Sequence, residues 1–489
     1  MFPMCCGYAN VNERSQIFDK LRIIIMSATL EAKLFSSYFD NAPVFIVKGP
    51  NVSLLRFSML NSIQKTLTMS SMRSYASRTS TKRSHLAIIS WYFLLEEKKL
   101  NAPPRNFLKA FEPPPAGHRK VVLATNIAET SLTIPGIRVV IDCGKVKTRY
   151  FTASDRTDVL RVHDVSKAQA IQRAGRAGRE APGKCYRLYP FEHFEKLQPC
   201  SVPEVLRSNL STVLLEMLAL GLRRPRKLKL IQQPDQESLL AAEQELIALG
   251  AVTMEGKNMI LTHVGNTLCK FPLSPDQARV LMVANELSCL EEALTVIAAM
   301  SCETVFDQSS QGEAEDIERI RSRFSVSASD HLSVLNVIQA FRREQKKNIH
   351  IVKEWCQNNY LNFKTILMVL KVRKQLREIA QECGMRIVSC GAQQEKLRQA
   401  LACGLFINVC EYDRQEDRYR LLVRPSTTLK IHPSSGLSRS CPRHIVFTDL
   451  VRTTDLYARD VSIIHYEWVQ PVIEEYKSNV KIVASSNHR

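Results

Sequence analysis

The octapeptide Gln-Arg-Ala-Gly-Arg-Ala-Gly-Arg, which ends at Arg179, constrains this chain more than any other stretch. On a helix that turns 100° per residue, Gln172, Arg176 and Arg179 fall within roughly a 60° stripe. Ser166 and Gln169 have the spacing of a capping box, which predicts a helix beginning just before this stretch. Two guanidinium groups can neutralise charge on a transferring phosphoryl group, and an amide can hold the attacking water. The octapeptide therefore predicts a helix face that contacts phosphate.

The two glycines of the octapeptide, Gly175 and Gly178, fall on another side of the predicted helix. A glycine inside a helix costs roughly 1 kcal/mol relative to alanine. A solvated basic helix is the alternative interpretation, and it leaves this cost unexplained. We therefore expect the glycines to permit close packing and the arginines to have a function.

Apolar runs predict strands that end in polar clusters. Residues 121–124 indicate a short buried strand, and the polar segment 125–131 follows at its carboxyl end. Residues 137–142 suit a neighbouring buried strand, and residues 22–26 indicate another, closed by Ser-Ala-Thr at 27–29. Open α/β sheets bind ligands at the carboxyl ends of their strands. The polar clusters are therefore candidate ligand contacts.

Three of these segments carry a family resemblance. Residues 27–29, 125–131 and 172–179 resemble motifs III, V and VI of the DEAH-box RNA helicases, in the same order and context. The resemblance implies an α/β fold, in which a RecA-like motor domain of the P-loop NTPase type precedes winged-helix, helical-bundle (ratchet) and OB-fold domains. It divides the chain into a remnant of the first RecA-like domain (1–50), the second RecA-like domain (51–200), a winged helix (201–270), a helical bundle (271–384) and an OB-fold (385–489).

Further matches lie downstream of these motifs. Residues 203–210 are similar to the start of the family's winged helix, and residues 289–294 to its ratchet domain. Residues 431–435 and 457–461 resemble parts of its terminal OB-fold. The resemblance thus extends through nearly all of the remaining chain.

The resemblance also implies roles for matching residues. Arg176 and Arg179 are similar to the arginine fingers, and Gln172 to the residue that positions the attacking water. Residues 150–165 lie where the family has a strand-separating hairpin. The remaining implied roles are ATP contacts at Phe111, Glu129 and Thr133, RNA contacts at Thr125, Asn126 and Arg149, and coupling of hydrolysis to motor movement at Ser27, Ala28 and Thr29.

Two elements that ATP hydrolysis requires are not recognisable in the sequence. A Gly-rich loop ending in Gly-Lys-Thr/Ser cradles phosphates, and an Asp-Glu pair holds Mg²⁺. The Gly-Lys pairs that begin at Gly144, Gly183 and Gly256 are each followed by a residue without a hydroxyl group. Residues 13–15 resemble the tail of motif II, but Ala-Asn-Val-Asn precedes them and supplies no carboxylate. The resemblance implies ATP and Mg²⁺, whereas this chain alone is expected to hydrolyse ATP negligibly.

The segment between residues 61 and 110 departs from the family pattern. Residues 66–84 are polar and basic without an acid, which predicts a linker or disorder. Residues 85–95 suit either one strand or a short helix, and the match resumes at Phe111. We therefore expect the second motor domain to lack a piece of its sheet, in an abbreviated or alternatively spliced chain.

The composition bounds the partners and the compartment. A chain of 489 residues with 45% hydrophobic residues suffices for roughly three to five folded domains. The formal charge of +19 favours a polyanion, with RNA as the expected partner and an anionic membrane as the rival. No apolar run reaches the ~20 residues of a membrane span, and no secretory signal opens the chain. The 14 cysteines form no Cys-x-x-Cys pair, so no metal site is expected.

Apolar periodicity divides the second half of the chain. Between Val205 and Leu220 apolar residues recur mostly at helical steps and predict a core face. A long helical stretch is expected over 317–379, and alternation predicts short strands from about Met385 onward. The helical stretch carries basic residues that suit either a solvated face or an RNA channel: Arg319, Arg321, Arg323, Arg342, Arg343, Lys346 and Lys347.

The leading functional hypothesis is an ATP-dependent RNA helicase of the DEAH type, which unwinds or remodels RNA or ribonucleoprotein in the nucleus. The nucleolus and the cytoplasm are the alternative locations. The alternative function is a catalytically inactive RNA-binding or assembly module derived from a helicase. Family analogy adds a glycine-patch-type activator as a partner. The RNA target, and the choice between splicing and ribosome assembly, stay open.

Overall fold

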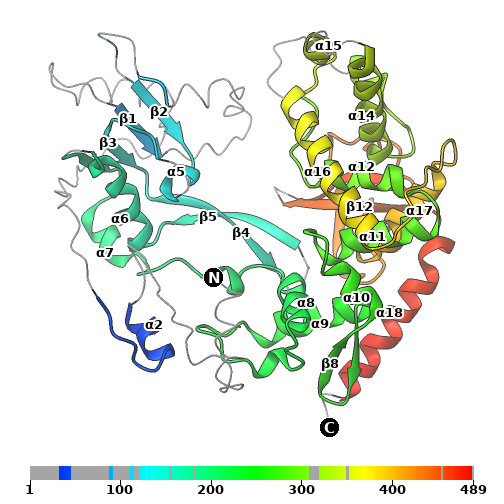
Figure 1. The fold of residues 1–489 in the computed structure, drawn as a ribbon, viewed down its shortest axis with the longest axis horizontal. Helices are drawn as coiled ribbons and strands as arrows, with labels where there is room; N and C mark the ends of the chain where they lie inside the picture. The colour runs from blue at the N-terminus through cyan, green and yellow to red at the C-terminus, as the bar shows by residue number, and fades with distance from the viewer. Residues whose placement is uncertain are drawn as a thin grey trace. The chain divides into compact units, whose positions relative to one another are not determined.

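The computed structural model divides the chain into two compact units (Figure 1). The motor lobe comprises 14–149 and 160–204, and the accessory unit comprises 1–13, 150–159 and 205–489. In the part of the chain that the structure describes, no helix is both long and apolar enough to cross a membrane. The described residues are 32–45, 87–91, 111–113, 118, 120–130, 133–152, 157–180, 182–307, 319–347, 352–452 and 455–486.

A four-stranded parallel sheet forms the centre of the motor lobe. Its order is β2 (Lys120–Ala124), β1 (Ala87–Trp91), β3 (Ile137–Asp142) and β6 (Lys184–Arg187). The strand predicted at 137–142 is confirmed, and five of its six residues are buried. Neighbouring parallel strands need crossover connections, which usually contain helices.

Strand β1 changes the expected neighbours in this sheet. It lies between β2 and β3, so those two strands are not adjacent as predicted. Residues 85–95 therefore contribute a strand, one of the two conformations expected for them. Strand β2 lies at one end of the described sheet, and Val121 on it is 48% exposed. The prediction of a buried strand at 121–124 is therefore wrong in its burial. The segments expected at 22–29 and 66–84 lie outside the described residues.

Helix α6 (Lys167–Gly175) carries the first part of the octapeptide. Its predicted capping box is confirmed: the Gln169 backbone N–H donates to Ser166 Oγ at 3.1 Å, and the Ser166 N–H donates to Gln169 Oε1 at 3.1 Å. From Arg176 the chain tightens into the 3₁₀ turn η2 (Arg176–Gly178). The octapeptide is therefore not one continuous α-helix. The other helices described in this lobe are α2 (Ala32–Tyr38), α5 (Ile127–Thr130) and α7 (Phe191–Lys196).

The glycines near the octapeptide pack differently from expectation. A Cβ atom added at Gly175 would meet no atom within 4 Å, so the prediction that this glycine permits close packing is wrong. The close approach occurs at Gly183 instead, where a Cβ atom would lie 2.1 Å from the carbonyl oxygen of Ala177. Gly183 therefore lets the start of β6 pass against the backbone of η2.

A two-stranded sheet follows β3 along the chain. It consists of β4 (Lys145–Thr152) and β5 (Thr157–Asp164). The hairpin expected at 150–165 is thereby confirmed, and its first strand begins earlier than expected. The Phe151 backbone N–H, near the far end of β4, donates to the Arg207 carbonyl at 2.7 Å.

The accessory unit begins with a small helical part that carries a β-hairpin. This part contains α8 (Ser211–Ala219), α9 (Gln236–Ala248), β7 (Val252–Glu255), β8 (Asn258–Leu261) and α10 (His263–Leu268). Strands β7 and β8 pair antiparallel. Short 3₁₀ turns lie near α8 at Glu204–Leu206 and Pro225–Lys227, and another lies much later in the chain at Phe406–Asn408.

The apolar face predicted between Val205 and Leu220 forms in its central part. Leu210, Leu214 and Met217 are buried in the main core, as predicted. Leu220, just after α8, is 56% exposed, and Leu206 is also exposed, so the prediction is wrong for these two residues. Both lie outside the regular α8 helix, where the helical period no longer decides which side faces the core.

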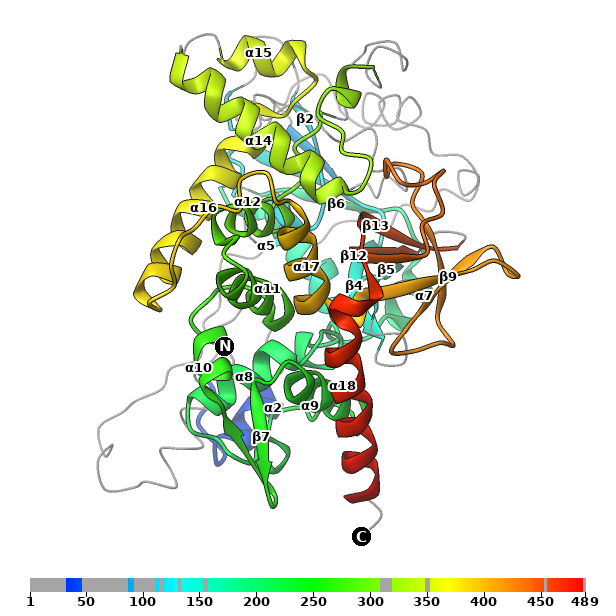
Figure 2. The ribbon, with the colours of Figure 1, turned by 90° about the vertical axis from the view of Figure 1, so that its right-hand side faces the viewer.

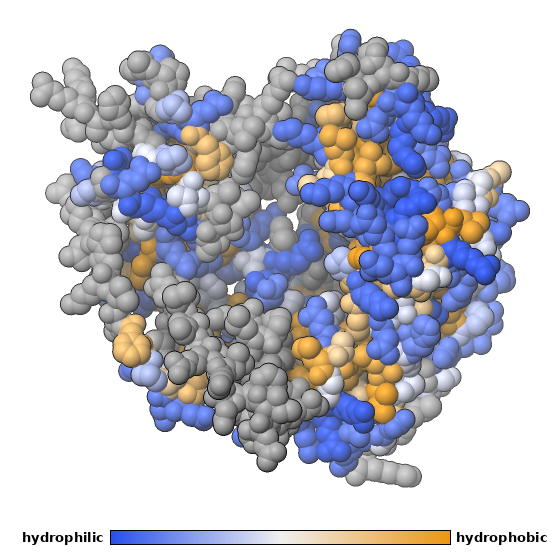
Figure 3. Space-filling view, in the orientation of Figure 1, coloured by the Kyte–Doolittle hydropathy of each residue, from blue (hydrophilic) through white to orange (hydrophobic). Residues whose placement is uncertain are grey.

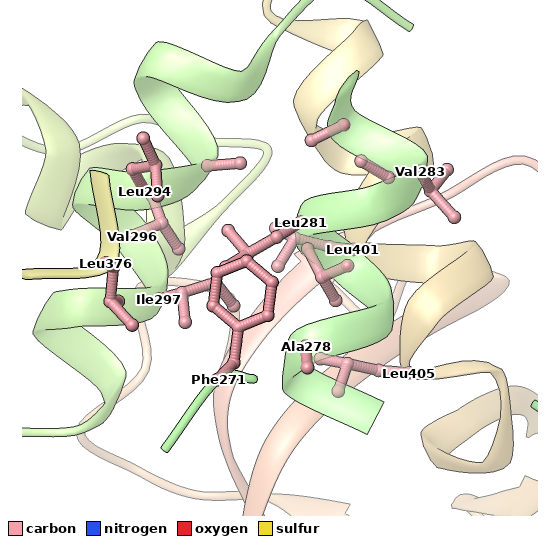
Figure 4. Packing of buried hydrophobic residues seen from close by; sticks show 14 of the residues in the cluster. Phe271, Ala278, Leu281, Val283, Leu294, Val296, Ile297, Leu376, Leu401 and Leu405 are labelled. Carbon is pink, nitrogen blue, oxygen red and sulfur yellow. The ribbon is translucent and has the colours of Figure 1, made fainter. Parts of the chain in front are cut away.

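Among the described residues, several further helices build the central part of the accessory unit. They are α11 (Pro275–Glu286), α12 (Leu290–Met300), α14 (Asp330–Lys347), α15 (Val352–Asn358) and α16 (Phe363–Glu382). Figure 4 shows Leu281, Ile297 and Leu376 of α11, α12 and α16 among the apolar side chains packed in this core. Polar residues occupy most exposed positions of α16 (Figure 3).

The single helical stretch expected over 317–379 is wrong, because separate helices occupy it. Between α15 and α16, Tyr360 has a φ of 52°, a left-handed conformation that an α-helix does not tolerate. Asn362 then caps α16, since its side-chain oxygen accepts from the Thr365 backbone N–H at 3.2 Å. Local backbone geometry therefore ends one helix and starts the next.

A closed five-stranded barrel follows helix α17 (Glu395–Gly404). Strands were expected from about Met385, but the first begins at Val409, because the preceding residues form α17 and pack in the helical core. The strand expected at 444–447 is confirmed within β12, whereas only residues 419–421 of the strand expected at 419–423 lie in β10. The barrel order is β10 (Arg418–Leu421), β11 (Thr428–Ile431), β13 (Leu456–Ile463), β12 (His444–Arg452) and β9 (Val409–Asp413), and α18 (Tyr466–Ser486) follows it.

Helix α17 fits between α11 and α18 (Figure 2). Gly404 is the point of closest approach, because a Cβ atom there would lie 2.4 Å from Val280 Cγ2 and 2.7 Å from the Val280 backbone nitrogen. Helix α17, which precedes the barrel in the chain, is therefore packed closely against the helical core.

The start of α14 docks onto the barrel through buried polar side chains. The carboxylate of Asp330 accepts from Ser435 Oγ at 2.5 Å and from the Val461 backbone N–H at 2.9 Å. The ring nitrogens of His331 lie 2.7 Å from Ser462 Oγ and 2.6 Å from Thr448 Oγ1. The helical part and the barrel are therefore joined by specific hydrogen bonds.

Acid is expected to weaken this joint. Burial lowers the pKa of His331, against the opposing charges of Asp460 and Asp330. A histidine with a depressed pKa stabilises the fold above its unfolded pKa of about 6.5, and this stability is lost as the pH falls below that value. The free energy of unfolding, measured by urea denaturation from pH 8 to pH 5, should fall more steeply in the natural chain than in His331→Asn. The extra slope should be up to about 1.4 kcal/mol per pH unit. Equal slopes would contradict this prediction.

Candidate nucleotide-binding and RNA-binding site

The two candidate arginine fingers both contact the segment that follows β2. Nη2 of Arg176 donates to the backbone carbonyl of Glu129. Nη1 of Arg179 donates to the hydroxyl oxygen of Thr133. Four of the residues predicted to form one site are therefore brought together.

Exposure differs among these residues in a way that suits an anion site. Arg176 is half-buried, whereas Arg179 and Thr133 are exposed. Burial lowers the pKa of Arg176, and the neighbouring charge of Arg179 lowers it further. Arginine nevertheless stays charged, because its reference pKa exceeds 12. Two adjacent positive charges favour an anion beside them.

Glu129 is held differently from the ATP contact that was predicted for it. Its side chain is buried, and its carboxylate accepts from Nε of Arg173 at 3.0 Å. Burial raises the pKa of Glu129, and the charge of Arg173 opposes this rise. The direct ATP contact remains a prediction, but this geometry favours a role for Glu129 in holding Arg173 and Arg176.

Arg173 is the residue of this region that the sequence analysis missed. Its side chain is 1% exposed, and its Nη1 donates to Asp142 Oδ1 at 2.9 Å and to the Lys145 carbonyl at 3.1 Å. A buried charge needs a partner. The signal available in the sequence was Asp142, an acid that ends a strand whose other residues are apolar except for Arg138.

Asp142 collects further hydrogen bonds at the carboxyl end of β3. Its Oδ1 also accepts from the Gly144 backbone N–H at 3.0 Å, and its Oδ2 accepts from the Tyr189 hydroxyl at 3.0 Å. Burial raises the pKa of Tyr189, and the charge of Asp142 raises it further. The phenol therefore stays protonated and keeps donating to the carboxylate.

The other predicted site residues lie elsewhere in the chain. Thr125 and Asn126 are exposed directly after β2, and Arg149 is exposed on β4. Phe111 is half-buried in a turn, and Gln172 is half-buried on α6. The coupling residues Ser27, Ala28 and Thr29 lie outside the described residues, so their roles stay predictions.

One arginine of the expected RNA channel takes part in a structural ion cluster. Arg377 Nη1 lies 3.1 Å from Glu291 Oε2, and Arg342 Nη1 lies 3.7 Å from Glu291 Oε1. Arg373 contacts the same carboxylate and also donates to Thr295 Oγ1 at 2.8 Å. The three guanidinium groups join α12, α14 and α16. Arg342, whose side chain is 41% exposed, therefore takes part in an ion cluster between helices, and its role in an RNA channel stays a prediction.

The donor set fits the phosphate part of a nucleotide. Guanidinium groups and a hydroxyl group, as at Arg176, Arg179 and Thr133, are suitable phosphate partners. Mg²⁺ needs carboxylate oxygens. Within the described ranges, no group of three or more His, Cys, Asp or Glu side chains is arranged to hold a metal ion. The described residues therefore fit the phosphate groups of a nucleotide, and the Mg²⁺ that the family implies stays a prediction.

Comparison with known families defines the class of protein. Residues 56–181 match the helicase conserved C-terminal domain, residues 274–334 match the ratchet-like helicase associated domain, and residues 397–476 match an oligonucleotide/oligosaccharide-binding fold. The chain thus combines a RecA-like helicase lobe with a ratchet domain and an OB-fold. It belongs to the DEAH-box family of ATP-dependent RNA helicases, as its similarity to full-length relatives shows.

Three relatives illustrate this similarity. The mouse ATP-dependent RNA helicase DHX33 is 33% identical over 481 residues, which cover 93% of this chain and 68% of the relative. The Drosophila melanogaster protein of the same name is 32% identical, over 96% of this chain and 70% of its own length. The Arabidopsis thaliana pre-mRNA-splicing factor ATP-dependent RNA helicase DEAH10 is 33% identical, over 92% of this chain and 66% of its own. The chain spans about two thirds of these relatives.

Proposed function

We propose that this chain supplies the C-terminal RecA-like lobe and the RNA-binding accessory domains of a helicase that remodels RNA or ribonucleoprotein in the nucleus. The observation that supports this most is the convergence of Arg176 and Arg179 on the segment that contains Glu129 and Thr133. The splicing and RNA helicase names of its relatives support an RNA or ribonucleoprotein substrate. We propose for the chain the same order of domains and the same boundaries that were predicted from the sequence.

In the proposed reaction, a water oxygen attacks the γ-phosphorus of ATP, and the bond to the β,γ-bridging oxygen breaks. Arg176 and Arg179 neutralise the negative charge that develops on the γ-phosphoryl oxygens. Gln172 orients the attacking water, and Thr133 contacts the nucleotide. Mg²⁺, which the family implies, would supply neutralisation of phosphate charge when bound with ATP.

Other residues would join nucleotide and RNA to this lobe. Phe111 is proposed to stack on the adenine, and Thr125, Asn126 and Arg149 to contact the RNA backbone. Ser27, Ala28 and Thr29 are proposed to couple hydrolysis to motor movement. Thr125 and Asn126 support this assignment by being exposed at the carboxyl end of β2, where α/β sheets bind ligands.

A glycine-patch-type activator is proposed, by analogy with the family, to dock on the winged-helix and OB-fold regions of the accessory unit. Mostly apolar residues line a small hollow in the first of these regions: Val205, Leu210, Val213, Leu214, Met217, Pro225, Leu230, Gln233, Pro234 and Leu239.

Purified chain alone is expected to show no RNA-stimulated ATP hydrolysis above background, because no Gly-Lys-Thr/Ser loop is recognisable in it. Phosphate release should be measured with and without single-stranded RNA, in the natural chain and in Arg176→Ala. An arginine finger contributes about 10³-fold or more to turnover. RNA-stimulated hydrolysis that disappears in Arg176→Ala would overturn the predicted inactivity and establish the fingers.

RNA binding by the same preparations separates a motor from a passive RNA-binding module. Affinity for single-stranded RNA should fall steeply with salt, with a logarithmic slope of about −0.7 for each phosphate contacted. An affinity that also changes when ATP is added supports a working motor, whereas an affinity indifferent to ATP supports the passive module. An affinity that does not respond to salt would contradict backbone binding in both cases.

A further inference from the structure

One buried guanidinium group connects three parts of the motor lobe. Arg173 reaches from α6 to the Glu129 carboxylate on α5, to the Asp142 carboxylate at the end of β3, and to the Lys145 carbonyl at the start of β4. Its side chain is 1% exposed, so water does not compete for these bonds. The planar guanidinium fork holds several acceptors in fixed directions, which an ammonium group cannot do.

On the α5 side, this connection meets the candidate fingers. Glu129 accepts from Arg173 through its carboxylate and from Arg176 through its backbone carbonyl. The position of Glu129 therefore depends on both arginines. Movement of Arg176 toward a phosphate would release its bond to the Glu129 carbonyl, whereas Arg173 would keep its bond to the Glu129 carboxylate.

On the other side, the connection meets the base of the β4–β5 hairpin. Gly144 has a φ of 74°, and its N–H donates to Asp142, while its carbonyl accepts from the Val165 N–H at 2.9 Å. A Cβ atom at Gly144 would lie 2.6 Å from the ring of Tyr189. The turn between β3 and β4 is thus fixed by the same carboxylate that binds Arg173.

We propose that Arg173 is a positioning residue that couples the finger-contacting segment at 125–133 to the base of the β4–β5 hairpin. A shift of Glu129 moves the guanidinium group, which in turn pulls on Asp142 and on the Lys145 carbonyl. The function of this coupling rests on the proposed function of the chain. Its geometry rests on the hydrogen bonds of the motor lobe described above. It gives a physical link between nucleotide contact and the hairpin.

Hydrogen exchange of the full chain, without nucleotide or RNA, tests this link. Tyr189→Phe removes only the hydroxyl that donates to Asp142. Exchange should rise at the Val165 amide, near the hairpin base. It should also rise at the Glu129 amide, which donates to the Asn126 carbonyl at 3.0 Å. Because hydrogen bonds to charged groups are among the stronger ones, the rise at Val165 is expected to be about tenfold.

Arg173→Lys should raise exchange at both amides and should abolish the further effect of Tyr189→Phe on Glu129 in the double variant. Arg398→Lys is the matched control, because Arg398 is also buried but donates to the Ile463 carbonyl at 2.9 Å in the accessory unit. It should leave the Glu129 amide unchanged.

A Tyr189→Phe variant whose exchange rises only near Val165 would overturn the coupling. A uniform rise across β3 and β6 would also overturn it, because Arg173 would then only stabilise the lobe. If Arg173→Lys does not fold, Tyr189→Phe and Glu129→Gln still decide the question. Since the measurement needs neither ATP nor RNA, a failed helicase assay leaves its result intact.

Discussion

Asp142→Ala is expected to lower the free energy of unfolding of the motor lobe by about 3–5 kcal/mol, the usual cost of breaking a buried ion pair. The substitution removes the acceptor of Arg173 Nη1 and of the Tyr189 hydroxyl, in a place that is 0% exposed. Arg173 would keep Glu129 as its only carboxylate among the partners described above. Urea denaturation followed by circular dichroism measures this loss.

The control for this prediction is Asp164→Ala in the same lobe. Asp164 pairs with Lys145 at 2.6 Å, but the two side chains are 39% and 50% exposed. Exposed ion pairs contribute about 0–1 kcal/mol, so this variant should unfold almost as the natural chain does. Equal losses in both variants would show that burial does not decide the strength of the Asp142 network.

Phe341→Ala is expected to destabilise the accessory unit by about 3–5 kcal/mol. Phe341 on α14 is 0% exposed, and its ring centroid lies 6.4 Å from that of Trp355 and 6.0 Å from that of Phe363. Truncation leaves a cavity between three helices that are joined to one another, so their collapse into it is limited. The loss should appear as a lower urea midpoint, followed by tryptophan fluorescence, to which Trp355 contributes beside two other tryptophans.

Leu367→Ala is the matched control for Phe341→Ala. Leu367 on α16 is 39% exposed, so its truncation opens no enclosed cavity. The expected change in the free energy of unfolding is within about 0.5 kcal/mol. A Phe341→Ala variant no less stable than Leu367→Ala would contradict the packing described for this core.

Features encoded by nearby residues were predicted well from the sequence. The capping box needs only Ser166 and Gln169, which are three positions apart, and the structure contains both of its hydrogen bonds. The strand at 137–142 and the hairpin that follows it are marked by apolar runs. Family motifs added the order of domains, which local patterns do not encode.

Features that depend on distant residues were missed. Arg173 finds its partners 44 and 31 positions away, so its burial follows from the folded sheet and not from its neighbours in sequence. The left-handed Tyr360 divides an otherwise periodic stretch. Likewise, residues 395–404 became a helix, since the main core offers them an apolar surface to cover. The catalytic and ligand roles of the site residues stay predictions.

The barrel formed by β9 to β13 closes on itself, so its strand order returns to its starting point. The backbone amide and carbonyl groups of those strands hydrogen-bond to one another, so the described barrel has no free strand edge to which another peptide could add a strand. A ligand of the barrel must consequently be bound by side chains and connecting loops. An open sheet of equal length would instead have offered its own backbone to a passing polypeptide.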